Sequence, residues 1–131
     1  MRFKTELFAH FVYSQKLSYE DLLVKEESFQ EALTQILTDV EAQFINFTPL
    51  GDTLRVQCVL EAHEESLFQA ICESIAPLMD ETLEGRLLFV EKELDILAIY
   101  GLAQKKWQES IIQIPVAGPI GAKLRKQAIK Q

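Results

Sequence analysis

Two histidines, His10 and His63, are the residues best suited to metal binding or acid–base chemistry. With only two imidazoles in the chain, a multi-histidine metal site would need carboxylates to complete it. Glu64 and Glu65 directly follow His63, but histidine and glutamate share a helix face at a spacing of four residues rather than one or two. Acidic residues such as Glu64 and Glu65 are typical of a helix N-terminus, and we interpret this stretch as the start of a helix. We therefore predict neither a metal site nor a cofactor.

Cys58 and Cys72 are the only cysteines. Cys58 lies in an alternating strand pattern and Cys72 in a helical one, so we predict buried free thiols rather than a disulfide or a reactive pair. Nucleophilic catalysis needs a serine or cysteine on a strained turn beside a base, and the sequence has no G-x-S-x-G pattern. The sequence therefore predicts no catalytic residue, and an enzyme of low specificity is the third of three functional hypotheses.

Four cations close the sequence: Lys123, Arg125, Lys126 and Lys130. Residues 116–131 contain no acid, whereas the whole chain carries a net charge of −7. These cations are candidates for binding an anion, such as a phosphate, an anionic lipid surface or an acidic protein groove. The acidic remainder of the chain and the lack of interleaved aromatics argue against nucleic acid. We favour a tail that is solvated or folds back on its own chain.

Length and composition predict one globular domain. The chain has 131 residues, of which 48% are hydrophobic and 25% charged, as is usual for a soluble protein. No apolar run approaches the ~20 residues of a membrane span, and the N-terminus lacks an apolar signal core. We expect a cytoplasmic protein without a membrane span. The breaker-rich stretch Val116–Gly121 divides it into a domain at 1–115 and a basic tail at 116–131.

Alternation of apolar residues predicts strands, and apolar residues at helical spacing predict helices. The expected elements are a strand at 3–13, a helical turn at 18–24, a helix at 28–41, strands at 43–48 and 53–62, a helix at 64–79, a hairpin within 86–102 and a last strand at 107–115. Ser28 and Glu31 have the spacing of a capping box, and Pro77 should distort the end of the second helix. We predict an α+β two-layer sandwich of ferredoxin-like (split βαβ) element order, extended by one or two C-terminal antiparallel strands.

Apolar residues on both sides of the hairpin strands suggest where the function lies. We predict that the helix-free face of the sheet carries six of them: Phe8, Val12, Leu87, Phe89, Leu97 and Ile99. Leaving such a patch in water would forgo several kcal/mol, at about 25 cal/mol per Å² of apolar surface, and patches of this kind are uncommon on monomers.

The first functional hypothesis is therefore a non-catalytic interaction or oligomerisation module that uses this face. Its partner would be a second copy, forming a homodimer, or another protein. The alternative is a small-ligand-binding domain with its pocket on the same face, where His10 or Tyr19 would provide a polar contact.

Overall fold

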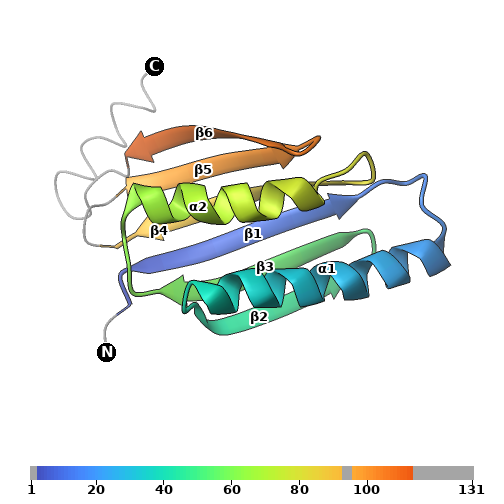
Figure 1. The fold of residues 1–131 in the computed structure, drawn as a ribbon, viewed down its shortest axis with the longest axis horizontal. Helices are drawn as coiled ribbons and strands as arrows, with labels where there is room; N and C mark the ends of the chain where they lie inside the picture. The colour runs from blue at the N-terminus through green and yellow to red at the C-terminus, as the bar shows by residue number, and fades with distance from the viewer. Residues whose placement is uncertain (1–2, 93–95, 114–131) are drawn as a thin grey trace, which may run out of the picture.

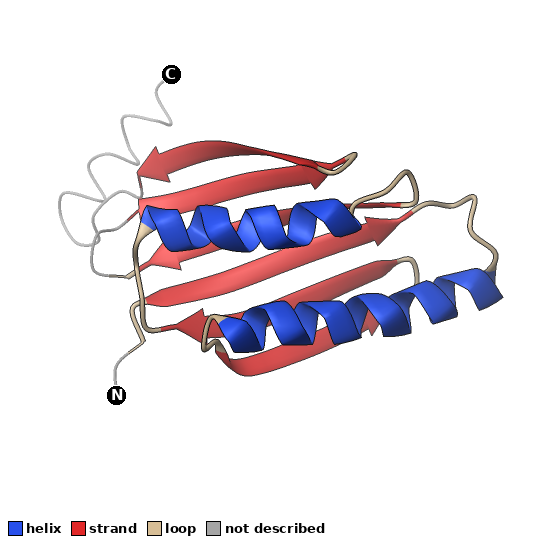
Figure 2. Ribbon diagram, in the orientation of Figure 1, coloured by secondary structure: helices blue, strands red, loops and turns tan. Residues whose placement is uncertain are grey.

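The computed structural model describes residues 3–92 and 96–113. They form a six-stranded antiparallel sheet and two α-helices, so the α+β class is confirmed (Figure 2). In chain order the elements are β1 (Thr5–Tyr13), α1 (Tyr19–Asp39), β2 (Gln43–Leu50), β3 (Thr53–Leu60), α2 (Glu65–Ile75), the 3₁₀ turn η1 (Ala76–Leu78), β4 (Leu83–Glu91), β5 (Ile96–Ala103) and β6 (Lys106–Gln113).

The sheet has the strand order β2-β3-β1-β4-β5-β6, and each strand runs antiparallel to its neighbours. Both helices lie on one face of the sheet (Figure 1). The predicted two-layer arrangement is therefore confirmed. Within the described part of the chain, no helix covers the opposite face, which we call the helix-free face.

The core lies between the helices and the sheet. Alternate residues of β1, from Thr5 to Tyr13, are buried against the helices. Phe11 packs edge-on against Phe29 of α1, with ring centroids 4.7 Å apart. On β4, Gly85 makes room for the Phe11 ring, because a Cβ at Gly85 would come within 2.3 Å of a ring carbon. Apolar alternation thus fixes which face of β1 the helices cover.

The start of α1 differs from the prediction. The helix begins at Tyr19 and runs unbroken to Asp39. Ser18 is its N-cap, and the Ser18 side chain accepts a hydrogen bond of 3.2 Å from the backbone N–H of Asp21. Ser28 lies inside the helix, so the predicted cap there is wrong. The buried stripe extends toward the N-terminus through Leu22 and Glu26, and the charge on Glu26 conceals that continuity in the sequence.

The end of α2 agrees with the prediction. The α-helix stops at Ile75 and continues as the 3₁₀ turn η1, which contains Pro77. Proline cannot donate the backbone hydrogen bond that a further α-helical turn would need. None of the described helices is long and apolar enough to span a membrane.

Candidate functional site

The helix-free face carries four of the six residues predicted for it. Phe8, Val12, Leu97 and Ile99 are half-buried, and each alternates along its strand with residues that the helices cover. These four therefore lie where the sequence placed them.

Leu87 and Phe89 do not lie on the helix-free face, and this part of the prediction is wrong. Both side chains are fully buried in the core, and the Phe89 ring stacks on Phe68 of α2 at 4.2 Å. The run from Leu87 to Val90 is apolar at every position, so periodicity cannot decide which residues face the helices. The strand register decides it: Leu87 pairs with Ala9 and Phe89 with Leu7, which are both core residues of β1.

Leu88 and Val90 take the place of those two residues on the helix-free face. Leu88 lies between Phe8 and Ile99 on the neighbouring strands, and residues directly opposite each other in a sheet share a face. Val90 pairs in the same way with Leu97. We call this group the apolar patch, and it comprises Phe8, Leu88, Val90, Leu97 and Ile99.

A row of cationic and potentially cationic side chains lies next to the apolar patch. His10 of β1 pairs with Arg55 of β3 on one side and with Arg86 of β4 on the other. Such cross-strand neighbours have Cβ atoms about 5 Å apart. Both arginines are exposed and His10 is half-buried. We call these three residues the cationic row.

Neither arginine of the cationic row forms an ion pair or a side-chain hydrogen bond within residues 3–92 and 96–113. Two lysines of the described residues do form ion pairs. Lys92 binds Glu6 at 2.9 Å and Lys25 binds Asp80. The two guanidinium groups therefore keep their donors available in a protein whose net charge is −7.

A groove of about 580 Å³ runs over the cationic row and the edge of the apolar patch. Its lining side chains and backbone come from β1, β2, β3, β4 and β5: Phe8, Ala9, His10, Asn46, Thr48, Arg55, Val56, Gln57, Arg86, Leu87, Leu88 and Ile99. A second hollow of about 470 Å³ shares His10 and Arg86 with it. The helix-free face is therefore hollowed and chemically mixed, with amide and hydroxyl groups at one side and apolar groups at the other.

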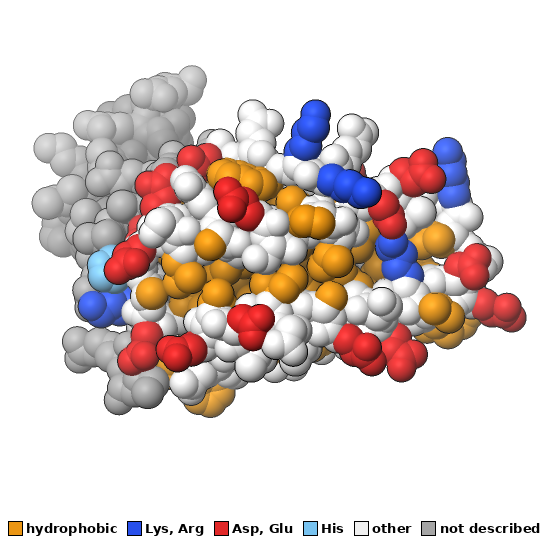
Figure 3. All heavy atoms as spheres, viewed as in Figure 1, with side chains coloured by type: hydrophobic (Ala, Val, Ile, Leu, Met, Phe, Trp, Pro, Cys, Tyr) orange, Lys and Arg blue, Asp and Glu red, His pale blue; other side chains and the backbone are white. Residues whose placement is uncertain are grey.

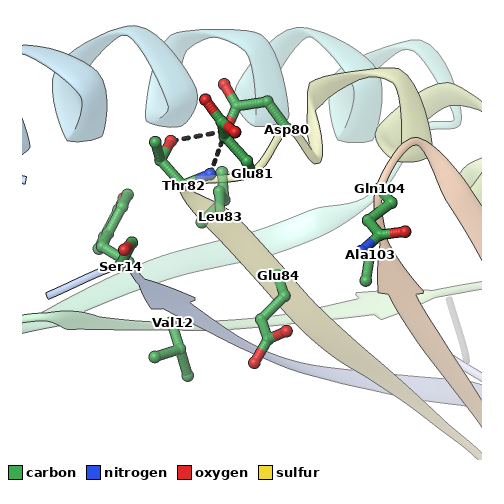
Figure 4. A pocket seen from close by; sticks show the side chains of 10 residues that line it. Val12, Ser14, Asp80, Glu81, Thr82, Leu83, Glu84, Ala103 and Gln104 are labelled. Atoms are coloured by element: carbon green, nitrogen blue, oxygen red, sulfur yellow. Dashed lines mark hydrogen bonds between the residues drawn. The ribbon is translucent and has the colours of Figure 1, made fainter. Parts of the chain in front are cut away.

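Another hollow, of about 310 Å³, lies where β1 ends and β4 begins (Figure 4). Its carboxylate Asp80 accepts hydrogen bonds from the Thr82 backbone N–H at 2.8 Å, from the Thr82 hydroxyl and from Lys25. Burial alone would raise the pKa of Asp80, but the hydrogen bonds from Lys25 and Thr82 outweigh it and lower the pKa to about 2. Because these bonds tie α1 to the segment before β4, we assign Asp80 a structural role.

The buried ionisable groups belong to the core. Burial raises the pKa of Cys58 and of Cys72 to about 12, and for Cys72 the nearby Glu109 and Glu73 add to the rise. Both cysteines are free, as predicted, and a thiol that stays protonated is a poor nucleophile. Burial also raises the pKa of Glu26.

His63 lies outside the groove. It lies beside Glu91. Burial raises the pKa of Glu91, His63 acts in the opposite direction, and Glu65 adds to the rise. Glu91 is buried on the helix-covered side of β4. Among the residues that the structure describes, no three His, Cys, Asp or Glu side chains are grouped as metal ligands would be.

His10 and Tyr19, the two side chains predicted as polar contacts for a ligand, lie on opposite sides of the sheet. His10 lies in the groove. Tyr19 lies in the first turn of α1, in the layer on the other face, where the helix end projects beyond the strands (Figure 1). Its side chain is 73% exposed, so Tyr19 cannot contribute to the same pocket.

The other side of the molecule is formed by the outer surfaces of α1 and α2 (Figure 1). Apolar side chains line the seam between α1 and α2, and acidic side chains flank it (Figure 3). Leu33 and Leu37 of α1 and Ile71 of α2 are each 0–1% exposed. The two helices therefore close over the core.

Sequence reasoning missed Arg55 and Arg86 as site residues. The alternation of β3 places Arg55 on its polar face, but only the pairing of β1 with both β3 and β4 brings the two arginines beside His10. The anion-binding residues that the sequence did predict lie outside the described residues: Lys123, Arg125, Lys126 and Lys130.

No family model and no curated protein matches this chain. Among solved structures it is similar to the crystal structure of the adenylyl cyclase CyaB from P. aeruginosa, with 13% sequence identity and a TM-score of 0.41. The match covers 99% of this chain and 74% of the cyclase chain. At that level of similarity the comparison assigns neither a fold family nor a function to this protein.

Proposed function

We propose that this protein is a non-catalytic binding module that holds a small ligand in the groove of its helix-free face. The observation that carries the proposal is the groove of about 580 Å³, where the apolar patch meets two arginines that form no ion pair among the described residues. Ligand pockets commonly have volumes of about 300–1,000 Å³ and combine apolar walls with a few converging polar groups. A hollowed face of this kind suits a compact ligand better than a flat partner surface.

The fold supports this use of the face. We infer that β1, α1, β2, β3, α2 and β4 form a ferredoxin-like split-βαβ unit, which β5 and β6 extend. The strand order β2-β3-β1-β4 within the sheet supports this inference. In such a plan both helices cover one face, so the other face is free to bind. Two free, buried thiols fit a reducing compartment such as the cytoplasm.

Self-association through the same face is the second candidate. The apolar patch favours it, because residues from three adjacent strands form one contiguous half-buried surface. If a homodimer covers this patch, Leu97→Glu should convert it into folded monomers, since an unpaired carboxylate at an interface is costly. Light scattering after size-exclusion chromatography would measure the mass. A wild type that is monomeric at micromolar concentration would exclude the dimer.

A neutral fluorescent probe tests the ligand-binding proposal. N-phenyl-1-naphthylamine has no charge and gains fluorescence in apolar sites, so its emission should rise with wild-type protein. Phe8→Glu places a carboxylate in the groove and should abolish the rise. Phe44→Glu is the matched control, because Phe44 is 75% exposed and does not line the groove. Circular dichroism verifies that each variant is folded.

Two results would contradict the proposal. One is the absence of any rise in emission with the wild type. The other is a rise that a folded Phe8→Glu variant retains in full. If Phe8→Glu does not fold, Phe8→Ser removes the ring without adding a charge, and the same comparison then applies to Phe8→Ser and Phe44→Ser.

A further inference from the structure

The cationic row has an arrangement that needs explanation. The cross-strand partners of Arg55 are His10 and Thr48, and those of Arg86 are His10 and Gly101, so no carboxylate lies directly opposite either arginine in the described sheet. No carboxylate of the described residues forms an ion pair with either arginine. Glu6 is bound by Lys92, and Glu84, two residues before Arg86 on β4, forms no ion pair among the described residues. The row therefore concentrates positive charge on an acidic protein.

We propose that the cationic row binds the phosphate group of a small phosphomonoester, whose apolar part lies on the apolar patch. The inference rests on the proposed function, because it names the ligand class for the same groove. Arg55 and Arg86 together carry two positive charges, which match a phosphate dianion. Each guanidinium can donate two parallel hydrogen bonds to phosphate oxygens. His10, between them, offers a further donor.

The spacing of the strands supports this geometry. Neighbouring strands lie about 4.8 Å apart, so the Arg55 and Arg86 backbones are separated by about 10 Å with His10 midway. Two long arginine side chains can converge over the imidazole from that distance. A carboxylate offers only two oxygens and one charge, so it would satisfy one arginine and leave the other unpaired.

The apolar patch begins two residues from the cationic row along the same strands. Phe8 lies two residues from His10 on β1, and Leu88 lies two residues from Arg86 on β4. Two residues along a strand span about 7 Å, which is close to the distance from a phosphate to the far edge of one attached aromatic ring. Both Phe8 and Leu88 line the groove together with Ile99. A phosphate joined to a small apolar group therefore fits the row and the patch at once.

Isothermal titration calorimetry with three naphthyl probes tests the inference on the full-length protein. The probes are 1-naphthyl phosphate, 1-naphthoate and neutral 1-naphthol, which share one ring system and differ in the attached group. We expect 1-naphthyl phosphate to bind at least tenfold more tightly than 1-naphthol, with 1-naphthoate between them. The preference should weaken as salt is raised, because exposed charges are screened.

Arg55→Gln and Arg86→Gln should each weaken the binding of 1-naphthyl phosphate about tenfold and leave the binding of 1-naphthol unchanged, because each variant removes charge-assisted hydrogen bonds to the phosphate. Lys16→Gln removes one charge from an exposed loop outside the groove and should change affinity less than twofold. All three positions are exposed, so the variants should fold.

The outcomes separate the inference from the proposed function. Equal binding of all three probes, or full affinity in both arginine variants, would overturn the phosphate site while the groove remains a binding site. Equal affinity for 1-naphthoate and 1-naphthyl phosphate would overturn the assignment of phosphate in favour of a carboxylate. Failure of every probe to bind would overturn both the inference and the proposed function.

Discussion

The two faces of one sheet differ in how they use the same strands. On the helix-covered face, Phe11, Leu87 and Phe89 are 0% exposed and contact aromatic or aliphatic neighbours. On the same strands β1 and β4, Phe8 and Leu88 point to the helix-free face and are only half-buried. The first face stabilises the fold. The second carries apolar and cationic groups that the described chain leaves available for binding.

The largest expected difference between the faces is in stability. Leu33→Ala and Ile71→Ala should each lower the free energy of unfolding by roughly 2–5 kcal/mol, because both side chains are almost fully buried between helix and sheet. Leu97→Ala on the helix-free face should cost less than about 1 kcal/mol. Urea denaturation of the three variants makes the comparison. A large loss for Leu97→Ala would mean that the helix-free face belongs to the core.

A smaller effect is expected at the start of α1. Ser18→Ala should lower the free energy of unfolding by about 1 kcal/mol, because it removes the acceptor for the Asp21 N–H. Ser28 lies inside the helix, so Ser28→Ala should change the free energy of unfolding little, and this variant is the matched control. Equal losses for the two variants, measured by thermal or urea denaturation, would contradict the assignment of Ser18 as the N-cap.

The Asp80 contacts that hold the helix layer should make stability depend on pH. The pKa of Asp80 in the folded state is lowered to about 2 from the usual 3.8. The carboxylate therefore contributes stability above about pH 4, and this contribution is lost as the pH falls through 2. In Asp80→Asn the free energy of unfolding should fall less between pH 4 and pH 2 than in the wild type, whereas Asp52→Asn should show the same fall as the wild type. Indistinguishable pH profiles for Asp80→Asn and the wild type would refute this role.

The smallest stability effect is expected in the cationic row. Arg55→Gln and Arg86→Gln remove no ion pair of the described chain, and both side chains are exposed, so the free energy of unfolding should change by less than about 0.5 kcal/mol. Denaturation of both variants measures this. A loss above 1 kcal/mol in either would mean that the arginines serve the fold rather than a ligand.

Apolar periodicity was sufficient to predict the class and the layers, because apolar residues such as Leu33 and Ile71 recur at helical spacing beside polar residues. It failed at Leu87 and Phe89, where four consecutive apolar residues give no phase and only the pairing with Leu7 and Ala9 decides the face. The cationic row was beyond sequence reasoning for a similar reason. His10, Arg55 and Arg86 are far apart in the chain, and the register of two strand pairs brings them together.

Mapping a bound probe by nuclear magnetic resonance tests most directly whether the helix-free face is the binding site. The chemical shifts of the backbone amides in isotopically labelled protein would be followed while 1-naphthyl phosphate is added. We predict that the largest changes occur on β1, β3 and β4 around His10, Arg55 and Arg86, with smaller changes at Leu88. The largest changes around the hollow at Asp80–Glu84, or at the exposed end of α1 near Tyr19, would contradict the assignment of the site to the helix-free face.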